Sequence, residues 1–106
     1  MSNEEKWLQV GPAADLAEGA MVGIEHGDLQ IAIYNLEGEF YATDNICSHA
    51  FALLTDGFLD GDVIECPLHG GCFKIKTGEG MGAPISEDIK TYPVRVTDGA
   101  IEVRIS

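Results

Sequence analysis

Hydrophobic and polar residues alternate in several short stretches of the chain, which is the spacing of a β-strand with one buried face. Polar residues between the apolar ones, such as Lys74 and Glu102, are expected to face solvent. The alternating apolar positions are Leu29, Ile31 and Ile33; Phe73 and Ile75; Val94 and Val96; and Ile101, Val103 and Ile105. A helical turn is expected only within residues 13–20.

Four segments of the form x-x-Gly-x lie between or beside these stretches. They are EHGD at 25–28, LEGE at 36–39, LDGD at 59–62 and TDGA at 97–100. Glycine accepts the positive φ that tight hairpin turns require. Short strands joined by such turns predict an all-β fold, an antiparallel sandwich or barrel.

The length and charge of the chain limit the number of its domains and the kinds of partner that it can bind. With 106 residues it is long enough for one domain. Six basic residues against 18 acidic ones give a net charge of −12, which disfavours binding to nucleic acids and to anionic membranes. The charge fits encounters with a basic partner, and it also fits a role in solubility alone.

The N-terminal segment MSNEEKW lacks the positive flank and apolar stretch of a signal peptide. No apolar run approaches the roughly 20 residues that span a bilayer. A cytoplasmic protein is therefore expected. Three cysteines in such a chain favour metal binding or a free thiol over a disulfide framework.

Two predicted loops, at about 45–56 and 66–72, carry the candidate chemistry. The first contains Cys47-Ser48-His49, and the second contains Cys66 and His69 with two residues between them. Two thiolates and two imidazoles suit zinc, copper or an iron–sulfur cluster, and not magnesium or calcium.

The four side chains allow two kinds of site. One is a structural zinc ion with two cysteine and two histidine ligands. The other is a [2Fe–2S] cluster in which Cys47 and Cys66 hold one iron while His49 and His69 hold the other. The single residue between Cys47 and His49 is a tight spacing for two ligands of one small ion, so the cluster is favoured.

Four segments then carry a family resemblance: YATDNICSH, DGFLDGDVIECPLHGG, FKIKTGEG and IKTYPV. They resemble the Rieske-type ferredoxins of bacterial multicomponent aromatic-ring-hydroxylating dioxygenases, of the naphthalene, biphenyl and carbazole kind. The resemblance implies a single Rieske domain over 1–106 and one [2Fe–2S] cluster bound by Cys47, His49, Cys66 and His69. It also implies a third loop, at about 77–88 and containing Pro84, that covers the other two.

The resemblance further implies a monomeric one-electron carrier, and not an enzyme with catalytic residues of its own. Such a carrier takes electrons from an NAD(P)H-dependent flavoprotein reductase and passes them to a terminal ring-hydroxylating oxygenase, through transient contacts with each partner. Two alternatives stay open. One is the small Rieske subunit of an assimilatory nitrite reductase, and the other is a zinc-stabilised interaction module.

The same resemblance predicts a low reduction potential. High-potential respiratory relatives have a disulfide between the two loops and hydroxyl donors near the cluster. The corresponding residues here are Ala52 and Leu68 for the disulfide, and Gly71 and Phe73 for the donors. The expected potential is therefore at the low end of the Rieske range, roughly −150 mV.

An apolar collar around the histidine end of the cluster is expected to form the docking face. Its candidate residues are Phe51, Leu53, Leu54, Met81 and Pro84, with a core position as the alternative for Leu53 and Leu54. Nearby acidic residues, namely Asp56, Glu79, Glu87 and Asp88, are candidates for steering a basic partner. Cys72 is expected to be a free thiol at the start of a strand.

Overall fold

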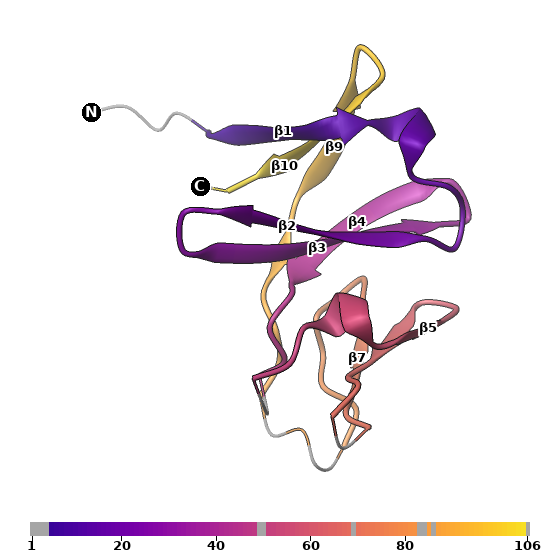
Figure 1. Cartoon of the computed structure of the whole chain (residues 1–106), viewed down its shortest axis with the longest axis vertical. Helices are drawn as coiled ribbons and strands as arrows, with labels where there is room; N and C mark the ends of the chain where they lie inside the picture. Colours follow the sequence, from indigo (N-terminus) through magenta and orange to yellow (C-terminus); the bar gives the residue numbers. More distant parts are fainter. Residues whose placement is uncertain (1–4, 49–50, 69, 83–84, 86, 106) are drawn as a thin grey trace.

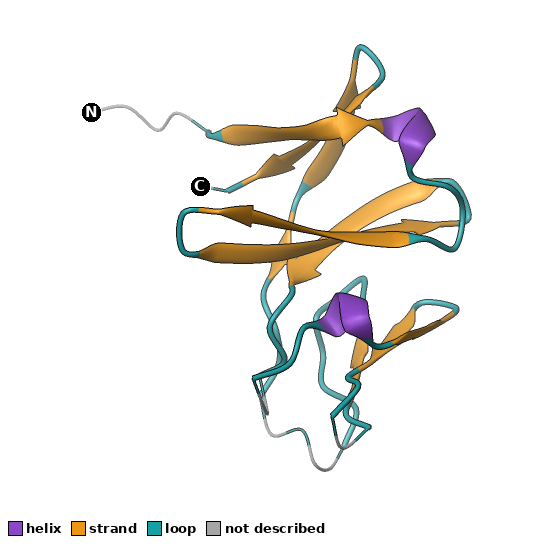
Figure 2. Ribbon diagram, viewed as in Figure 1, coloured by secondary structure: helices purple, strands orange, loops and turns teal. Residues whose placement is uncertain are grey.

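The computed structural model describes residues 5–48, 51–68, 70–82, 85 and 87–105. Within these residues the chain forms ten β-strands and two short 3-10 helices, η1 and η2 (Figure 2). The strands are β1 (Trp7–Pro12), β2 (Met21–His26), β3 (Leu29–Leu36), β4 (Glu39–Asp44), β5 (Phe58–Asp60), β6 (Val63–Glu65), β7 (Cys72–Lys74), β8 (Thr91–Tyr92), β9 (Val94–Thr97) and β10 (Ala100–Arg104). The predicted all-β fold is confirmed.

The strands form three antiparallel sheets in two parts of the molecule (Figure 1). The basal part contains the sheet β1-β10-β9 and the sheet β2-β3-β4-β8. The loop part contains the sheet β5-β6-β7, helix η2 (Leu54–Asp56) and the long loops, and it lies in the lower half of Figure 1. Within the described residues, both helices are 3-10 turns of three residues, so neither could span a bilayer.

Strand β3 is buried on both faces and holds the two parts together. Ile31 and Ile33 pack with residues of β10 in one core cluster. Tyr34, on the opposite face, packs in a second cluster that includes Cys47 and Cys66. The alternation of Leu29, Ile31 and Ile33 correctly predicted one buried face. The second face is buried because the loop part covers it.

The four predicted turns are confirmed. Their glycines all have positive φ, and in two of the turns the preceding residue does as well, Glu37 at 56° and Asp98 at 52°. Positive φ at both central residues is the geometry of a type I′ hairpin turn, which matches the twist of the flanking strands.

Three details differ from the sequence-based expectation. The helical turn expected within 13–20 is only η1 (Ala13–Asp15). Helix η2 lies inside the segment that was predicted to be an irregular loop. The sequence did not predict it, because a three-residue helix has neither the length nor the composition that separates a helix from a loop. Val94 is partly buried, but Val96, on the same face of β9, is 48% exposed. Strand β9 is the edge strand of its sheet, so fewer neighbours cover its side chains.

Asp44, at the end of β4, joins the two chain segments that connect the basal and loop parts. Its main-chain N–H donates to the carbonyl of Lys90 at 2.9 Å, and its carboxylate accepts from the Lys90 N–H at 3.4 Å. The same carboxylate accepts from the Tyr92 hydroxyl at 2.5 Å. Burial, and then the Asp44 carboxylate, raise the pKa of Tyr92. The outgoing and returning segments therefore enter the loop part side by side.

Candidate cluster-binding site

Cys47 lies in a loop that folds back on itself directly after β4. Ile46 and Leu53 form a β-bridge across this loop, and the Cys47 N–H donates to the Ala52 carbonyl at 3.0 Å. The Cys47 side chain is 3% exposed. These contacts place the Cys47 thiol against the core cluster on the second face of β3.

Cys66 occupies the equivalent position directly after β6. Its N–H donates to the Gly71 carbonyl at 2.6 Å, which closes the second loop. The Leu68 N–H lies 3.5 Å from the Cys66 sulfur and donates to it. Main-chain donors to a ligand sulfur are one of the features that tune the potential of an iron–sulfur centre. Cys72 begins β7, opposite Glu65, as predicted.

The two buried cysteines are free thiols that interact with each other. Burial is the main cause that raises the pKa of the Cys66 thiol, the Leu68 N–H lowers it, and the neighbouring Cys47 side chain raises it further. Without a cation, the Cys66 thiol therefore resists ionisation. A bound iron ion would replace their protons and compensate the negative charge, so this donor pair fits one end of an iron–sulfur cluster.

The two predicted imidazole ligands, His49 and His69, lie outside the described residues. Among the residues that are described, no group of three or more His, Cys, Asp or Glu side chains is placed to hold a metal ion. Of the predicted ligand set, the structure brings together the two cysteines, which lie in the same core cluster.

The third loop lies against the other two through main-chain and side-chain hydrogen bonds. The Met81 N–H donates to the Cys72 carbonyl at 2.9 Å, and the Ser48 hydroxyl donates to the Glu87 carbonyl at 2.7 Å. Gly78 approaches the opposite side of this loop so closely that a Cβ there would lie 2.1 Å from the Ile89 carbonyl oxygen. The third loop is thus fixed against the first and against β7. Pro84 lies outside the described residues.

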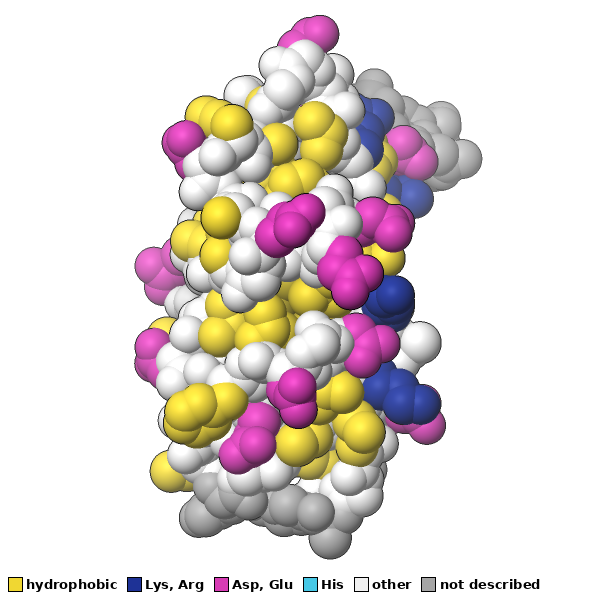
Figure 3. Space-filling model, turned by 90° about the vertical axis from the view of Figure 1, so that its right-hand side faces the viewer, with side chains coloured by type: hydrophobic (Ala, Val, Ile, Leu, Met, Phe, Trp, Pro, Cys, Tyr) yellow, Lys and Arg dark blue, Asp and Glu magenta, His cyan; other side chains and the backbone are white. Residues whose placement is uncertain are grey.

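Several large apolar side chains in the three loops are exposed. Phe51 is fully exposed, and Leu53 and Met81 are 38% and 43% exposed, whereas Leu54 is completely buried in the core. The predicted collar did not include Ile46 and Leu68, which lie in the two ligand loops and are also exposed. Their position beside the predicted ligands Cys47 and His69 was the available signal. Figure 3 shows hydrophobic side chains at the surface of the lower part, interspersed with acidic ones.

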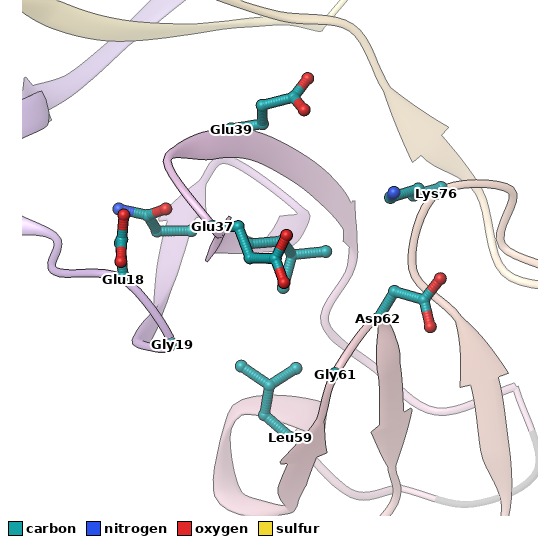
Figure 4. A pocket seen from close by; sticks show the side chains of 10 residues that line it. Glu18, Gly19, Glu37, Glu39, Leu59, Gly61, Asp62 and Lys76 are labelled. Carbon is teal, nitrogen blue, oxygen red and sulfur yellow. The ribbon is translucent and has the colours of Figure 1, made fainter.

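A cavity of about 630 Å³ lies away from the cysteines, at the junction of the basal and loop parts (Figure 4). Four of its ten lining residues are acidic, and Lys76 is its one basic lining residue among those described. The acidic lining residues are Glu18, Glu37, Glu39 and Asp62. Because neither Cys47 nor Cys66 lines it, this cavity is separate from the candidate cluster site.

Comparison with known proteins identifies the class to which this fold and cysteine pair belong. The profile of the Rieske [2Fe-2S] domain matches residues 6–93, and the chain belongs to this family. The chain is 43% identical, over 95% of its length and 97% of the relative, to the ferredoxin component of the naphthalene 1,2-dioxygenase/salicylate 5-hydroxylase systems of a Ralstonia species.

Solved structures agree with this assignment. The ferredoxin in a complex of reduced oxygenase and oxidized ferredoxin of carbazole 1,9a-dioxygenase superposes with a TM-score of 0.89 and 38% identity, covering 92% of each chain. A putative NADH-dependent nitrite reductase small subunit from Mycobacterium tuberculosis superposes with a TM-score of 0.86 at 24% identity, covering 98% of each chain. At that identity the second likeness concerns the fold alone.

Proposed function

We propose that this protein is a one-electron carrier of an aromatic-ring-hydroxylating dioxygenase system. It accepts electrons from an NAD(P)H-dependent flavoprotein reductase and delivers them to the terminal oxygenase, and it has no substrate-converting site of its own. The observation that carries the proposal is the 43% identity over nearly the whole chain to a dioxygenase ferredoxin component. The two free, buried cysteines on paired loops supply the matching chemistry.

One [2Fe–2S] cluster would be held by Cys47 and Cys66 at one iron and by His49 and His69 at the other. When bound, such a cluster takes up and releases a single electron. Two thiolates and two neutral imidazoles give the site less negative charge than four thiolates, so reduction is easier than in an all-cysteine cluster. The Leu68 N–H that donates to the Cys66 sulfur favours the reduced state further.

The exposed apolar residues of the three loops form the docking face in this proposal. Phe51, Leu53 and Met81 can exclude water when a partner covers them, which allows close packing between the two proteins. The net charge of −12 would guide a partner with a basic surface toward this face. Contacts of this kind are transient, and the carrier works as a cytoplasmic monomer.

A nitrite reductase subunit is the less supported alternative. The nitrite reductase relative shares the fold at 24% identity, whereas the two dioxygenase ferredoxins described above share 38% and 43% at similar coverage. The greater identity therefore favours the dioxygenase role.

Reconstitution tests the proposed function. Purified protein is combined with NADH, a ferredoxin reductase and a ring-hydroxylating oxygenase, and the hydroxylated product is measured. We expect product formation to require the protein and to be lost in Cys66→Ser but retained in Cys72→Ser. Product formation that does not depend on the added protein would refute the proposal.

A further inference from the structure

A buried asparagine connects the basal part to the first loop. Asn45 lies two residues before Cys47 and is 2% exposed. Its main-chain N–H donates to the Gln30 carbonyl of β3 at 2.8 Å, and its carbonyl accepts from the Leu54 N–H at 2.7 Å. The backbone of Asn45 therefore contacts both the central strand of the basal part and the far end of the Cys47 loop.

The side chain of Asn45 forms a second connection to the same end of the loop. Its Oδ1 accepts from the Thr55 N–H at 2.9 Å, and its Nδ2 donates to the Thr55 hydroxyl oxygen at 3.0 Å. A primary amide supplies one acceptor and one donor in this arrangement without adding a charge. The amide thus joins the first residue of the predicted 45–56 loop to helix η2 at the end of that loop, and the segment with Cys47 is closed at its base.

Gly23 on β2 provides the space that this amide occupies. A Cβ at position 23 would lie 2.7 Å from Asn45 Nδ2 and 3.1 Å from Thr55 Oγ1. The backbone of Gly23 is not in the left-handed region, so an alanine there would be unstrained apart from these contacts. The glycine is needed for close packing against Asn45, and not for its conformational freedom.

We propose that Asn45, bonded to Thr55 and backed by Gly23, is a positioning residue that fixes the Cys47 thiol beside Cys66. The inference rests on the proposed function in that Cys47 is taken as a cluster ligand. A rigid loop base keeps both sulfurs at their bonding positions without the iron having to order the loop. Residues that orient metal ligands in this way typically change metal affinity by about 10- to 100-fold when they are removed.

The test uses variants that alter the Asn45–Thr55 contact from the Thr55 side and from the Gly23 side. Thr55→Val removes the hydroxyl acceptor and leaves the main-chain donor in place, while Thr55→Ser keeps the hydroxyl and serves as the matched control. Gly23→Ala pushes on the amide from β2. Asn45→Ala removes the amide, and the pair Gly23→Ala with Asn45→Ala completes a double-mutant cycle.

Two measurements are made on the holo protein: the rate of cluster loss to a chelator, from the visible absorbance, and amide hydrogen exchange by mass spectrometry. We expect Thr55→Val and Gly23→Ala to lose the cluster roughly tenfold faster than the wild type. Exchange should rise in peptides covering 46–54 and stay unchanged in peptides covering 63–74. Thr55→Ser should behave as the wild type. Gly23→Ala should have a smaller effect once Asn45 is alanine, because only the 3.1 Å approach to Thr55 Oγ1 then remains.

Wild-type rates of cluster loss and exchange in Thr55→Val and Gly23→Ala would overturn the inference. So would a uniform rise of exchange over both loops and the basal strands, because that pattern indicates general destabilisation. These outcomes are distinct from failure of the proposed function, in which the wild-type protein itself would contain no cluster or would not support the oxygenase.

Discussion

The Ser48 hydroxyl donates a hydrogen bond to the main-chain carbonyl of Glu87 at 2.7 Å. Ser48 stands between the two proposed ligands of the first loop, and Glu87 lies at the end of the third loop. This single side-chain contact therefore connects the segment that carries Cys47 with the segment that covers it.

Ser48→Ala is expected to release the third loop from the first. A hydrogen bond of this kind contributes about 1 kcal/mol, and less here because Ser48 is exposed. Global stability should therefore fall only slightly, while limited proteolysis within 77–88 becomes faster. Ser48→Thr keeps the hydroxyl and should protect the loop as the wild type does. Equal cleavage of all three proteins would show that the contact does not hold the loop.

Gly78→Ala is expected to be far more destabilising than Gly99→Ala. Both glycines have a φ of +79°, so both substitutions introduce the same backbone strain, roughly 1–2 kcal/mol. At Gly99 a Cβ meets nothing within 4 Å, whereas at Gly78 it would lie 2.1 Å from the Ile89 carbonyl oxygen. Urea titrations give the free energy of unfolding of both variants, and the difference between them measures the cost of the contact with Ile89. Equal free energies of unfolding would show that this contact costs nothing.

Tyr34 makes the stability of the protein sensitive to alkaline pH. Its hydroxyl lies 2.9 Å from Thr43 Oγ1, which itself donates to the Asp44 carbonyl, so Tyr34 is the donor. Burial raises the pKa of Tyr34 to about 12, above the value of about 10 in the unfolded chain. The folded state therefore favours the protonated phenol. The contribution of Tyr34 to the free energy of unfolding is fully present below about pH 10 and is lost as the pH rises through about 12.

Tyr34→Phe should reduce that alkaline sensitivity. Urea unfolding at a series of pH values between about 8 and 11 is the measurement, and the variant should show a shallower loss of stability above about pH 10. At neutral pH the variant should lose about 1 kcal/mol or less, because Thr43 keeps its bond to Asp44. Tyr41→Phe, at a half-buried ring, is the control. A wild-type pH profile in Tyr34→Phe would contradict the assignment.

Electron transfer from the reductase is expected to slow as salt is added. The net charge of −12 would speed encounters with a basic partner at low ionic strength, and salt screens that attraction. Stopped-flow reduction at several salt concentrations measures the effect, with reduction by a small uncharged mediator as the control. If both rates are equally independent of salt, the acidic surface serves solubility alone.

His69→Cys is expected to retain part of the cluster and to lower its reduction potential. The substitution exchanges a neutral ligand for a negative one, which makes the addition of an electron less favourable. Potentiometric titration followed by visible absorbance measures the change. A potential that is unchanged or higher would exclude His69 as a ligand.

Alternation and turn chemistry predicted β3, β7, β9, β10 and four hairpin turns, because both are local properties of the chain. The other six strands of the described residues were not singled out, since their sequences show no clear alternation. Nor could local pattern decide between core and surface for adjacent apolar residues. Leu53 and Leu54 are neighbours of the same type, yet one is exposed and the other is completely buried. Their difference depends on helix η2 and on how the loop part packs on β3, which are long-range features.

The cysteine–histidine spacing predicted a site of four ligands. The structure brings Cys47 and Cys66 together, and the two histidine ligands stay a prediction. The residues that support the site could not be predicted in the same way. Asn45 and Thr55 are separated by ten residues, and Gly23 comes from a different hairpin, so no local pattern connects them. Only the packing of β2 against η2 gives these three residues a common role.

In the proposed site, each of the two loops contributes one sulfur and one imidazole ligand to a single [2Fe–2S] cluster. Pulsed electron paramagnetic resonance of the dithionite-reduced protein can identify these ligands, because the technique detects nitrogen nuclei bonded to the iron. We predict couplings from two imidazole nitrogens, one from His49 and one from His69. Protein without iron, or a reduced spectrum without nitrogen couplings, would contradict the account.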